Sequence, residues 1–322
     1  MKKFFKILAV LAVVLGACFF IFRTPDTDAA EMRAKYGVAP SQFVTLSNGQ
    51  EVHLRDEGPK DAPAIILLHG ANSSLHTWDD WAQALKTEYR VIRFDQMGHG
   101  LTGPASDGDY SKAGFVADVQ SVANHLELKE FVLAGNSMGG WVAAAYALEN
   151  SERVSGLGLL NASGAPRNTE EERLYLGAAI ASTPVLNKVM TSITPRNLVR
   201  ASMEDAVADP AMITEQLVDR YWELLRFPGN RQAVVDRANT ARGGHFQPEN
   251  LATLAMPALV MWGEEDRVTP TSGAEYYTEH LPNAQQIMYS GVAHLPMEEA
   301  PQKSVDDFKK WLVNGPFKVE AP

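Results

Sequence analysis

The chain has 322 residues, of which 45% are hydrophobic, and a formal net charge of −10. This is enough apolar material for one large α/β domain with an insertion. Because basic residues are not clustered beyond the first few positions, the composition disfavours nucleic-acid binding. The acidic surface offers no attraction to anionic lipid head groups.

The first 23 residues form a separate segment. Met-Lys-Lys-Phe-Phe-Lys is basic, and an apolar run from Ile7 to Phe22 follows and ends at Arg23. Three interpretations remain open: an uncleaved membrane anchor with the lysines inside, a cleaved secretory signal, and a lipoprotein signal ending at Cys18, because Leu-Gly-Ala-Cys resembles a bacterial lipobox. All three place the globular part outside the cytoplasm, on the periplasmic side of a bacterial membrane or at the cell surface. The anchor and the lipoprotein would bind the membrane through this segment.

Cysteine usage is minimal. Cys18 is the only cysteine, so the globular part has neither a disulfide nor a thiol nucleophile, and an oxidising compartment would not harm it. Residues 24–40, which follow the apolar run, are expected to form a linker with a short helix.

From residue 41 onward the chain alternates between predicted strands and helices. Strands at 43–46 and 51–55 flank Asn48-Gly49, which is a hairpin signal. Further strands, several of them continuously apolar as buried parallel strands are, are predicted at 64–68, 90–94, 131–134, 154–160, 258–262 and 285–289. Helices are predicted at 78–85, 111–126, 141–148, 272–281 and 304–313. This order predicts an α/β fold with a mostly parallel, twisted sheet and helices on both faces.

Residues 164–250 interrupt the alternation. No buried-strand run occurs there, and prolines divide the segment into several predicted helices. We expect a helical cap inserted into a core that is formed by residues 41–163 and 251–316. Its place in the chain order would let the cap cover the carboxyl edge of the sheet.

The most informative stretch is Gly135-Asn136-Ser137-Met138-Gly139, between an apolar strand and a helix. A G-x-S-x-G pattern at a strand-to-helix turn holds the serine in strained backbone geometry with its hydroxyl exposed. Ser137 is therefore the candidate nucleophile. The backbone N–H of Met138 is a candidate donor to an oxyanion formed at the serine, because it lies at the start of the helix.

A serine nucleophile needs a base, and an acid that orients the base; the chain order expected here is serine, acid, histidine. Three histidines follow Ser137. His294 is the candidate base, because it follows the strand at 285–289 and catalytic groups gather after strand ends in open α/β sheets. His245 leaves the cap segment and is the weaker candidate, and His280 lies in a predicted surface helix.

The acid is expected after the strand at 258–262. Asp266 fits best, and Glu264 is the alternative. An acid here should be ionised, so that it holds the imidazole in the required tautomer.

A second oxyanion donor is expected in the loop after the strand at 64–68. This loop begins His69-Gly70-Ala71, where Gly70 allows a tight turn and the N–H of Ala71 is the candidate donor. His69 is interpreted as a buried structural histidine.

Other chemistries have no support in the sequence. It contains no H-E-x-x-H, no C-x-x-C and no carboxylate cluster with metal-ligand spacing, so no metal site is predicted. Gly98-His99-Gly100 lacks the third glycine of a dinucleotide-binding fingerprint. We therefore expect neither a metal nor an organic cofactor.

Five segments together closely resemble the α/β-hydrolase superfamily in order and spacing: HGANSSLHTW, DQMGHGLTG, GNSMGG, WGEEDRVTP and GVAHLPMEEAP. The resemblance covers about residues 40–315. It implies the α/β-hydrolase fold, with Ser137, Asp266 and His294 as the catalytic triad. Met97 stands where many members carry proline, and we expect no mechanistic consequence. A serine nucleophile argues against the epoxide-hydrolase and haloalkane-dehalogenase branches, which use aspartate at this position.

Three functions remain open. A carboxylic-ester hydrolase of the esterase or lipase type, acting on a small-molecule ester, suits the exported N-terminus. A hydrolase of carbon–carbon bonds is the first alternative, because GNSMGG resembles the elbow of meta-cleavage-product hydrolases; those enzymes usually carry tryptophan after the catalytic histidine, where this chain has Leu295. A catalytically silent binding protein on the same scaffold is the second.

Overall fold

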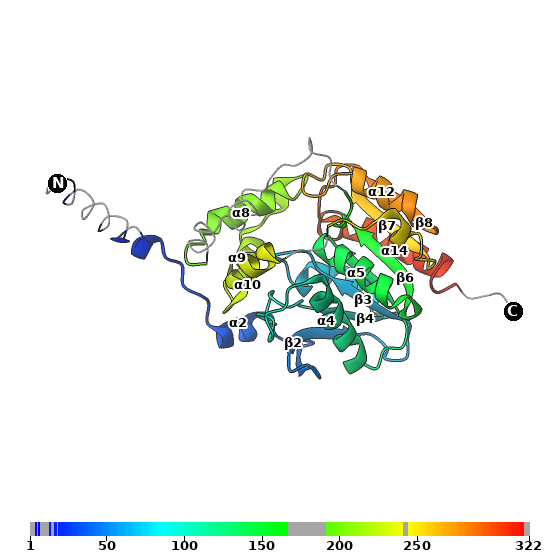
Figure 1. The fold of residues 1–322 in the computed structure, drawn as a ribbon, viewed down its shortest axis with the longest axis horizontal. Helices are drawn as coiled ribbons and strands as arrows, with labels where there is room; N and C mark the ends of the chain where they lie inside the picture. Colours follow the sequence, from blue (N-terminus) through cyan, green and yellow to red (C-terminus); the bar gives the residue numbers. More distant parts are fainter. Residues whose placement is uncertain are drawn as a thin grey trace.

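The computed structural model describes residues 4, 6, 13, 16, 17, 19–166, 191–240 and 244–318. In this part of the chain, an eight-stranded sheet has the order β1-β2-β4-β3-β5-β6-β7-β8 (Figure 1). The strands are β1 (Gln42–Thr45), β2 (Glu51–Glu57), β3 (Ala64–Leu68), β4 (Arg90–Phe94), β5 (Phe131–Asn136), β6 (Val154–Leu160), β7 (Ala258–Gly263) and β8 (Ala284–Tyr289). Each predicted strand is found, and no end moves by more than two residues.

The pairing of the strands is mostly parallel. β2 runs antiparallel to both β1 and β4, while β4, β3, β5, β6, β7 and β8 pair in parallel. The β1–β2 hairpin turns at Gly49, whose φ of 83° is readily adopted only by glycine. The predicted fold class is therefore confirmed. Because the central strands are parallel, their carboxyl ends meet at one edge, where side chains from loops far apart in the sequence can meet.

Helices cover both faces of the sheet. One face carries α4 (Lys112–His125), α5 (Met138–Glu149) and α12 (Ser272–His280); the other carries α3 (Asp79–Leu85) and α14 (Pro301–Asn314). Alternate residues of β3 enter the two apolar cores: Ile66 and Leu68 lie in one, Ile65 and Leu67 in the other. The strand is buried on both sides because its side chains alternate in direction, and this explains its continuously apolar sequence.

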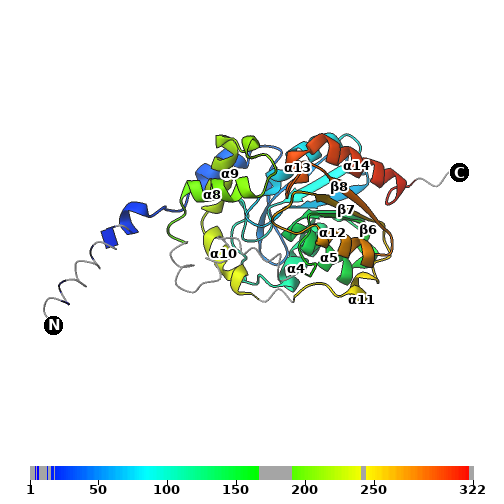
Figure 2. The ribbon, with the colours of Figure 1, turned by 90° about the horizontal axis from the view of Figure 1, so that it is seen from above.

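The described part of the segment between β6 and β7 is helical. It contains α8 (Arg196–Asp205), η3 (Pro210–Met212), α9 (Glu215–Leu225), α10 (Asn230–Asn239) and α11 (Pro248–Leu251). α8, α9 and α10 lie together on the side of the molecule from which the N-terminal segment leaves (Figures 1 and 2). Val199, Met203, Val207, Ile213 and Val218 form a small apolar core of their own here. We call residues 191–240 the cap.

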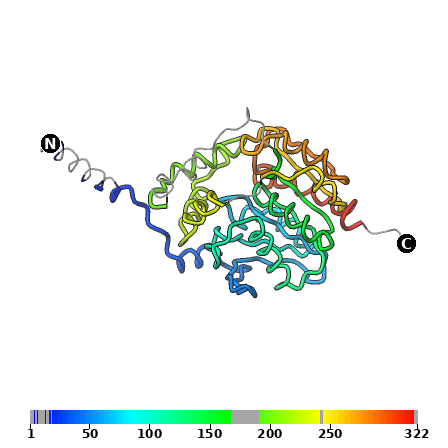
Figure 3. The backbone as a smooth tube through the Cα atoms, viewed as in Figure 1, coloured from blue at the N-terminus to red at the C-terminus, as the bar shows by residue number. Residues whose placement is uncertain are grey.

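The segment that precedes β1 forms hydrogen bonds and an ion pair with the cap. Residues 24–36, here called the N-terminal strap, include the expected short helix, α2 (Ala29–Tyr36), and run along the cap helices before β1 (Figure 3). The backbone N–H of Thr24 donates to Ser192 O at 2.8 Å, and Arg231 of α10 forms an ion pair with Asp26 at 2.5 Å. The predicted linker thus has specific polar partners on the cap.

The apolar run at the N-terminus is described only in part. Its described residues are 13, 16, 17 and 19–22, and Cys18 lies outside them. Within the described part of the chain, no helix is both long and apolar enough to cross a membrane.

Candidate active site

Ser137 lies at a sharp turn between β5 and α5. Its backbone has φ 53° and ψ −116°, a strained conformation for a residue with a side chain. The turn is possible because glycines surround it: a Cβ on Gly135 would lie 2.3 Å from the backbone of Gly139, and a Cβ on Gly139 would lie 2.3 Å from Leu68 O. The strained geometry predicted for Ser137 is confirmed.

The loop after β3 lies directly against this turn. A Cβ added to Gly70 would be 3.2 Å from the Cβ of Ser137, so the two backbones are in close contact. Met138 is the first residue of α5, and its N–H therefore has no acceptor within the helix. The structure thus brings the β3 loop (residues 69–73), which carries Ala71, to the side of Ser137.

Asp266 and His294 meet at the carboxyl ends of β7 and β8. The Nδ1 atom of His294 lies 2.9 Å from Oδ2 of Asp266, and both side chains are buried. Burial alone would raise the pKa of Asp266, but the charge of His294 and the hydrogen bonds from His294, Thr269 and Asn161 outweigh it and hold this pKa below its usual value. The carboxylate is therefore ionised at neutral pH, as the sequence analysis expected.

Two residues that the sequence analysis missed hold this carboxylate. Thr269 donates to Asp266 Oδ2 from its hydroxyl at 2.6 Å and to Oδ1 from its backbone N–H at 3.1 Å. Asn161 donates from Nδ2 to Oδ2 of Asp266 and to Ala293 O. Its backbone has a left-handed φ of 45°. Asn161 directly follows β6, and a polar residue at a strand's carboxyl end was the signal that could have identified it.

The backbone of His294 is held both by the turn at Ser137 and by the cap. Asn136 donates from Nδ2 to His294 O at 3.0 Å, and the N–H of His294 donates to Ala206 O in the cap at 3.0 Å. Within the described residues no hydrogen bond joins Ser137 Oγ to the His294 ring. Such bonds are often long in ligand-free enzymes and shorten in complexes with substrate.

The alternative residues lie elsewhere. Glu264 and His245 are exposed, and His280 bonds Tyr276 O within α12. His69 is buried between Gly70 O and the N–H of Gln96, and burial lowers the pKa of its ring. It has the surroundings of the structural histidine that we expected.

In the described ranges, no group of three or more His, Cys, Asp or Glu side chains could hold a metal ion. A cavity of about 810 Å³ lies away from Ser137, between residues 38–40, β2 and α3. Its charged lining is largely paired within itself, for example Arg93 with Glu57 at 2.7 Å, and we assign it no chemistry.

Known proteins define the class to which this fold and site belong. The model of the alpha/beta hydrolase family matches residues 65–307. The chain therefore belongs to the α/β-hydrolase family and is a hydrolase of that fold. An uncharacterized hydrolase of Bacillus subtilis, YugF, is 27% identical over 276 residues, which cover 85% of this chain and 99% of that protein.

Solved structures share the fold at lower identity. A meta-cleavage product hydrolase from Pseudomonas fluorescens superposes with a TM-score of 0.74 at 23% identity, covering 85% of this chain and 97% of that one. A membrane phospholipase A superposes with a TM-score of 0.73 at 21% identity, covering 99% of this chain and 100% of that one. At these identities the similarity concerns the fold.

Proposed function

We propose that the protein is a serine hydrolase that cleaves carboxylic esters through an acyl-enzyme intermediate. The observation that carries this proposal is the strained turn of Ser137, with φ 53°, at the sheet edge where His294 pairs with Asp266. A serine in this conformation presents its hydroxyl above the carboxyl edge of the sheet. The buried His–Asp pair is the partner that such a hydroxyl needs in order to react.

The roles of the three side chains follow from their hydrogen-bonding capacities. Ionised Asp266 can only accept, so Nδ1 of His294 carries its hydrogen toward Asp266 and Nε2 keeps a lone pair. In the proposed reaction Nε2 takes the proton of Ser137, whose Oγ attacks the ester carbonyl. His294 then protonates the leaving alcohol, and water repeats the sequence to release the acid.

The oxyanion that forms during each attack needs donors at fixed positions. In the proposal these are the backbone N–H groups of Met138 and Ala71. The N–H of Met138 points out of the start of α5, where the helix dipole favours negative charge. The N–H of Ala71 belongs to the loop that touches Ser137 through Gly70. Such donors act on the transition state more than on the ground state.

Ester hydrolysis is favoured over cleavage of carbon–carbon bonds. The superposition on a membrane phospholipase A covers 99% of this chain, whereas that on the meta-cleavage product hydrolase covers 85%. Leu295 also follows His294 where enzymes of the meta-cleavage type usually carry tryptophan. Cleavage of carbon–carbon bonds remains the second candidate because of the elbow sequence GNSMGG and that shared fold.

A substrate panel tests this choice. Purified protein is assayed with p-nitrophenyl esters of increasing acyl length and, in parallel, with a dienone substrate of the meta-cleavage type. Ester turnover that disappears in Ser137→Ala supports the proposal, and turnover of the dienone alone would overturn it. A protein that cleaves neither substrate and is not labelled at Ser137 by a serine-reactive phosphonate would be the catalytically silent binding protein.

We further propose that the N-terminal segment holds the protein at a membrane, with the folded part on the extracytoplasmic side. The basic residues that precede the apolar run support this orientation. Phe20, Ile21 and Phe22 are 74%, 74% and 63% exposed, which is unfavourable in water and expected of a segment that contacts lipid.

Cell fractionation tests the membrane proposal. Full-length mass in the membrane fraction supports an anchor, and a lipid on Cys18 supports the lipoprotein. A chain that begins at Thr24 keeps the strap contacts and should be soluble. Recovery of the intact full-length chain in the cytosol would overturn the proposal.

A further inference from the structure

Two cap helices touch the loop that carries Ala71. Arg237 of α10 donates from Nη2 to Oδ1 of Asn72 at 3.1 Å. The hydroxyl of Tyr221, on α9, lies 3.2 Å from Oγ of Ser73. The two residues that directly follow Ala71 are therefore both held by side chains of the cap.

Arg237 also reaches the other side of the loop through a histidine. Nη1 of Arg237 contacts both ring nitrogens of His99, at 2.9 Å for Nδ1. The ring of His99 packs edge-on against His69, with 4.9 Å between the centroids. Arg237 is therefore linked directly to Asn72 and, through His99, to His69. His69 and Asn72 are the residues on either side of Gly70-Ala71.

The protonation state of His99 suits this contact. Burial, followed by the charge of Arg237 and by His69, holds the pKa of His99 well below its usual value, so the ring is neutral. Because Nδ1 lies 3.1 Å from Met97 O, it carries the hydrogen, and Nε2 is left to accept from Arg237. An arginine can only donate, so its hydrogen bonds go to Nε2 of His99 and to Oδ1 of Asn72.

The loop itself needs external support. Asn72 has φ 60°, in the left-handed region that residues other than glycine occupy at a cost, although asparagine tolerates it better than most. A loop in this conformation is retained when surrounding contacts over-determine it. Arg237 as a residue is only 4% exposed, so its bond to Asn72 is protected from competing water.

We propose that Arg237 is a positioning residue for the oxyanion hole. Acting through Asn72 and His99, it fixes the β3 loop so that the N–H of Ala71 points at the oxygen that becomes charged. The inference rests on the proposed serine-hydrolase function. In this proposal the cap helps to complete the oxyanion hole. The oxyanion is absent from the bound ester and forms only in the tetrahedral intermediate and in the transition states on either side of it. A misplaced donor therefore lowers kcat and leaves KM nearly unchanged.

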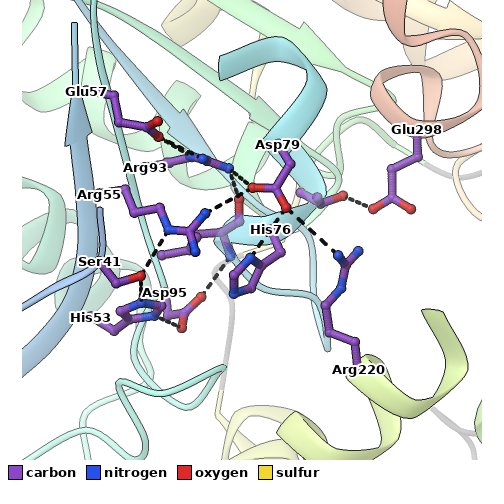
Figure 4. A network of polar contacts seen from close by, with 12 residues as sticks. Ser41, His53, Arg55, Glu57, His76, Asp79, Arg93, Asp95, Arg220 and Glu298 are labelled. Carbon is purple, nitrogen blue, oxygen red and sulfur yellow. Dashed lines mark hydrogen bonds and ion pairs between the residues drawn. The ribbon is translucent and has the colours of Figure 1, made fainter. Parts of the chain in front are cut away.

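The first test compares two arginines of the cap. Arg237→Met is expected to lower kcat by about 30- to 100-fold. Complete removal of an oxyanion donor costs about 10²- to 10³-fold, and a donor that is only displaced should cost somewhat less. Arg237→Lys should recover part of the loss, because one ammonium group can still donate to one of the two acceptors. Arg220→Met is the matched control: Arg220 of α9 faces Asp79 of α3, at 4.0 Å (Figure 4), and no hydrogen bond or ion pair in the described part of the chain joins it to the β3 loop.

The control distinguishes positioning of the β3 loop from attachment of the cap to the rest of the protein. Arg220→Met should keep kcat within about threefold of the unchanged protein, because only a cap contact is lost. Equal losses of kcat in both arginine variants would mean that cap docking is what matters, and would overturn the proposal. A change in KM alone for Arg237→Met would assign Arg237 to substrate binding and also overturn it.

A second test removes the partner of Arg237. Asn72→Gly keeps the left-handed conformation without strain and lacks the amide. In that background Arg237→Met should cost clearly less kcat than in the unchanged protein, because one of its two routes to the loop is already gone. Fully additive losses would overturn the coupling through Asn72.

A third measurement does not depend on the substrate. The rate at which a fluorophosphonate labels Ser137 depends on the nucleophile and on the oxyanion donors. The measurement needs no natural ester. If the unchanged protein is labelled but cleaves no ester, the ester proposal fails while this inference is still tested. Wild-type labelling of Arg237→Met, with an unchanged thermal unfolding midpoint, would overturn the inference alone.

Discussion

Among the described residues, two His–Asp pairs meet at less than 3 Å, and their surroundings differ. His294 and Asp266 meet at 2.9 Å at the carboxyl ends of β7 and β8. His53 of β2 and Asp95, at the end of β4, meet at 2.7 Å, and Nε2 of His53 lies 2.8 Å from Oγ of Ser41 (Figure 4). The second group therefore also contains a serine, a histidine and an aspartate in hydrogen-bonding order.

The second group has the surroundings of a structural network. The His53 and Asp95 side chains are fully buried, and the backbone N–H groups of Leu75 and Leu101 donate to Asp95 at 2.7 and 2.8 Å. Oγ of Ser41 also accepts from Nε of Arg55 at 3.0 Å. Asp95 thus orders the loops that follow β3 and β4.

The comparison separates residue type from function. Ser41 precedes an edge strand, whereas Ser137 occupies a strained turn with the first N–H of a helix and the β3 loop beside it. A reactive serine needs donors for the developing oxyanion as well as a base. We therefore expect chemistry at Ser137 and hydrogen bonding alone at Ser41.

Substitution of the two serines should give the largest contrast. Ser137→Ala is expected to lower kcat by about 10⁴- to 10⁶-fold while the protein stays folded. Ser41→Ala, the matched control, removes hydrogen bonds worth about 1 kcal/mol each and should leave kcat nearly unchanged. Ester hydrolysis and phosphonate labelling measure both. A phosphonate adduct on Ser41 would remove the distinction between the two groups.

His294→Ala should be as damaging as Ser137→Ala. The two losses should not add in the double variant, because the residues act as a unit. His245→Ala is the control and should be mild, since His245 is exposed. A severe loss of kcat at His245 with little loss at His294 would reverse the choice of base.

Substitution of the two aspartates should affect different quantities. Asp266→Asn should lower kcat by about 10³- to 10⁴-fold, because an amide can no longer hold the imidazole in the required tautomer. Asp95→Asn should reduce the free energy of unfolding instead, since the buried carboxylate accepts from two loops. Steady-state kinetics and chemical denaturation on both variants check this. The same kinetic loss from either change would contradict the comparison.

His53→Ala should lower stability. It removes the Nδ1–H that donates to the buried Asp95 carboxylate, and a buried charged group that loses a hydrogen-bond partner costs about 1–3 kcal/mol. The protein that remains folded should keep its kcat. Denaturant unfolding, with hydrolysis measured well below the transition, tests both parts; a loss of kcat comparable with that of His294→Ala would contradict them.

The smallest expected effect is on the pH dependence of stability. Burial would raise the pKa of Asp95, but the charge and hydrogen bond of His53, with the charge of His69, outweigh it and hold this pKa well below its usual value. A depressed pKa means that the folded state binds fewer protons than the unfolded state. The stability from Asp95 is therefore complete above its ordinary pKa of about 3.9 and is lost as the pH falls toward the folded value.

Denaturation at pH 7 and pH 3 checks this sign. The difference in unfolding free energy between the unchanged protein and Asp95→Asn should shrink by about 1 kcal/mol from pH 7 to pH 3. An equal or larger difference at pH 3 would show that the ionised form of Asp95 does not stabilise the fold.

Local patterns predicted the strands and the three candidate catalytic side chains. Ser137 directly follows a strand-like run, and Asp266 and His294 lie in the loops that follow two others; the carboxyl ends of parallel strands meet at one edge. The start of α5 was less well predicted. The helix begins at Met138 rather than near Trp141, because packing against the sheet outweighs the low helix propensity of Gly139 and Gly140.

The sequence by itself determined the fold class, the sharp turn at Ser137 and the order of the candidate groups, because these depend on residues that are neighbours in the chain. Only the tertiary structure decided that Asn161 and Thr269 hold Asp266, that Arg237 reaches Asn72, and that a second His–Asp pair lies within the core. Most of these contacts join residues far apart in the chain, and all depend on side-chain direction. No local pattern encodes such contacts, since they exist only once the sheet, the loops and the cap are packed together.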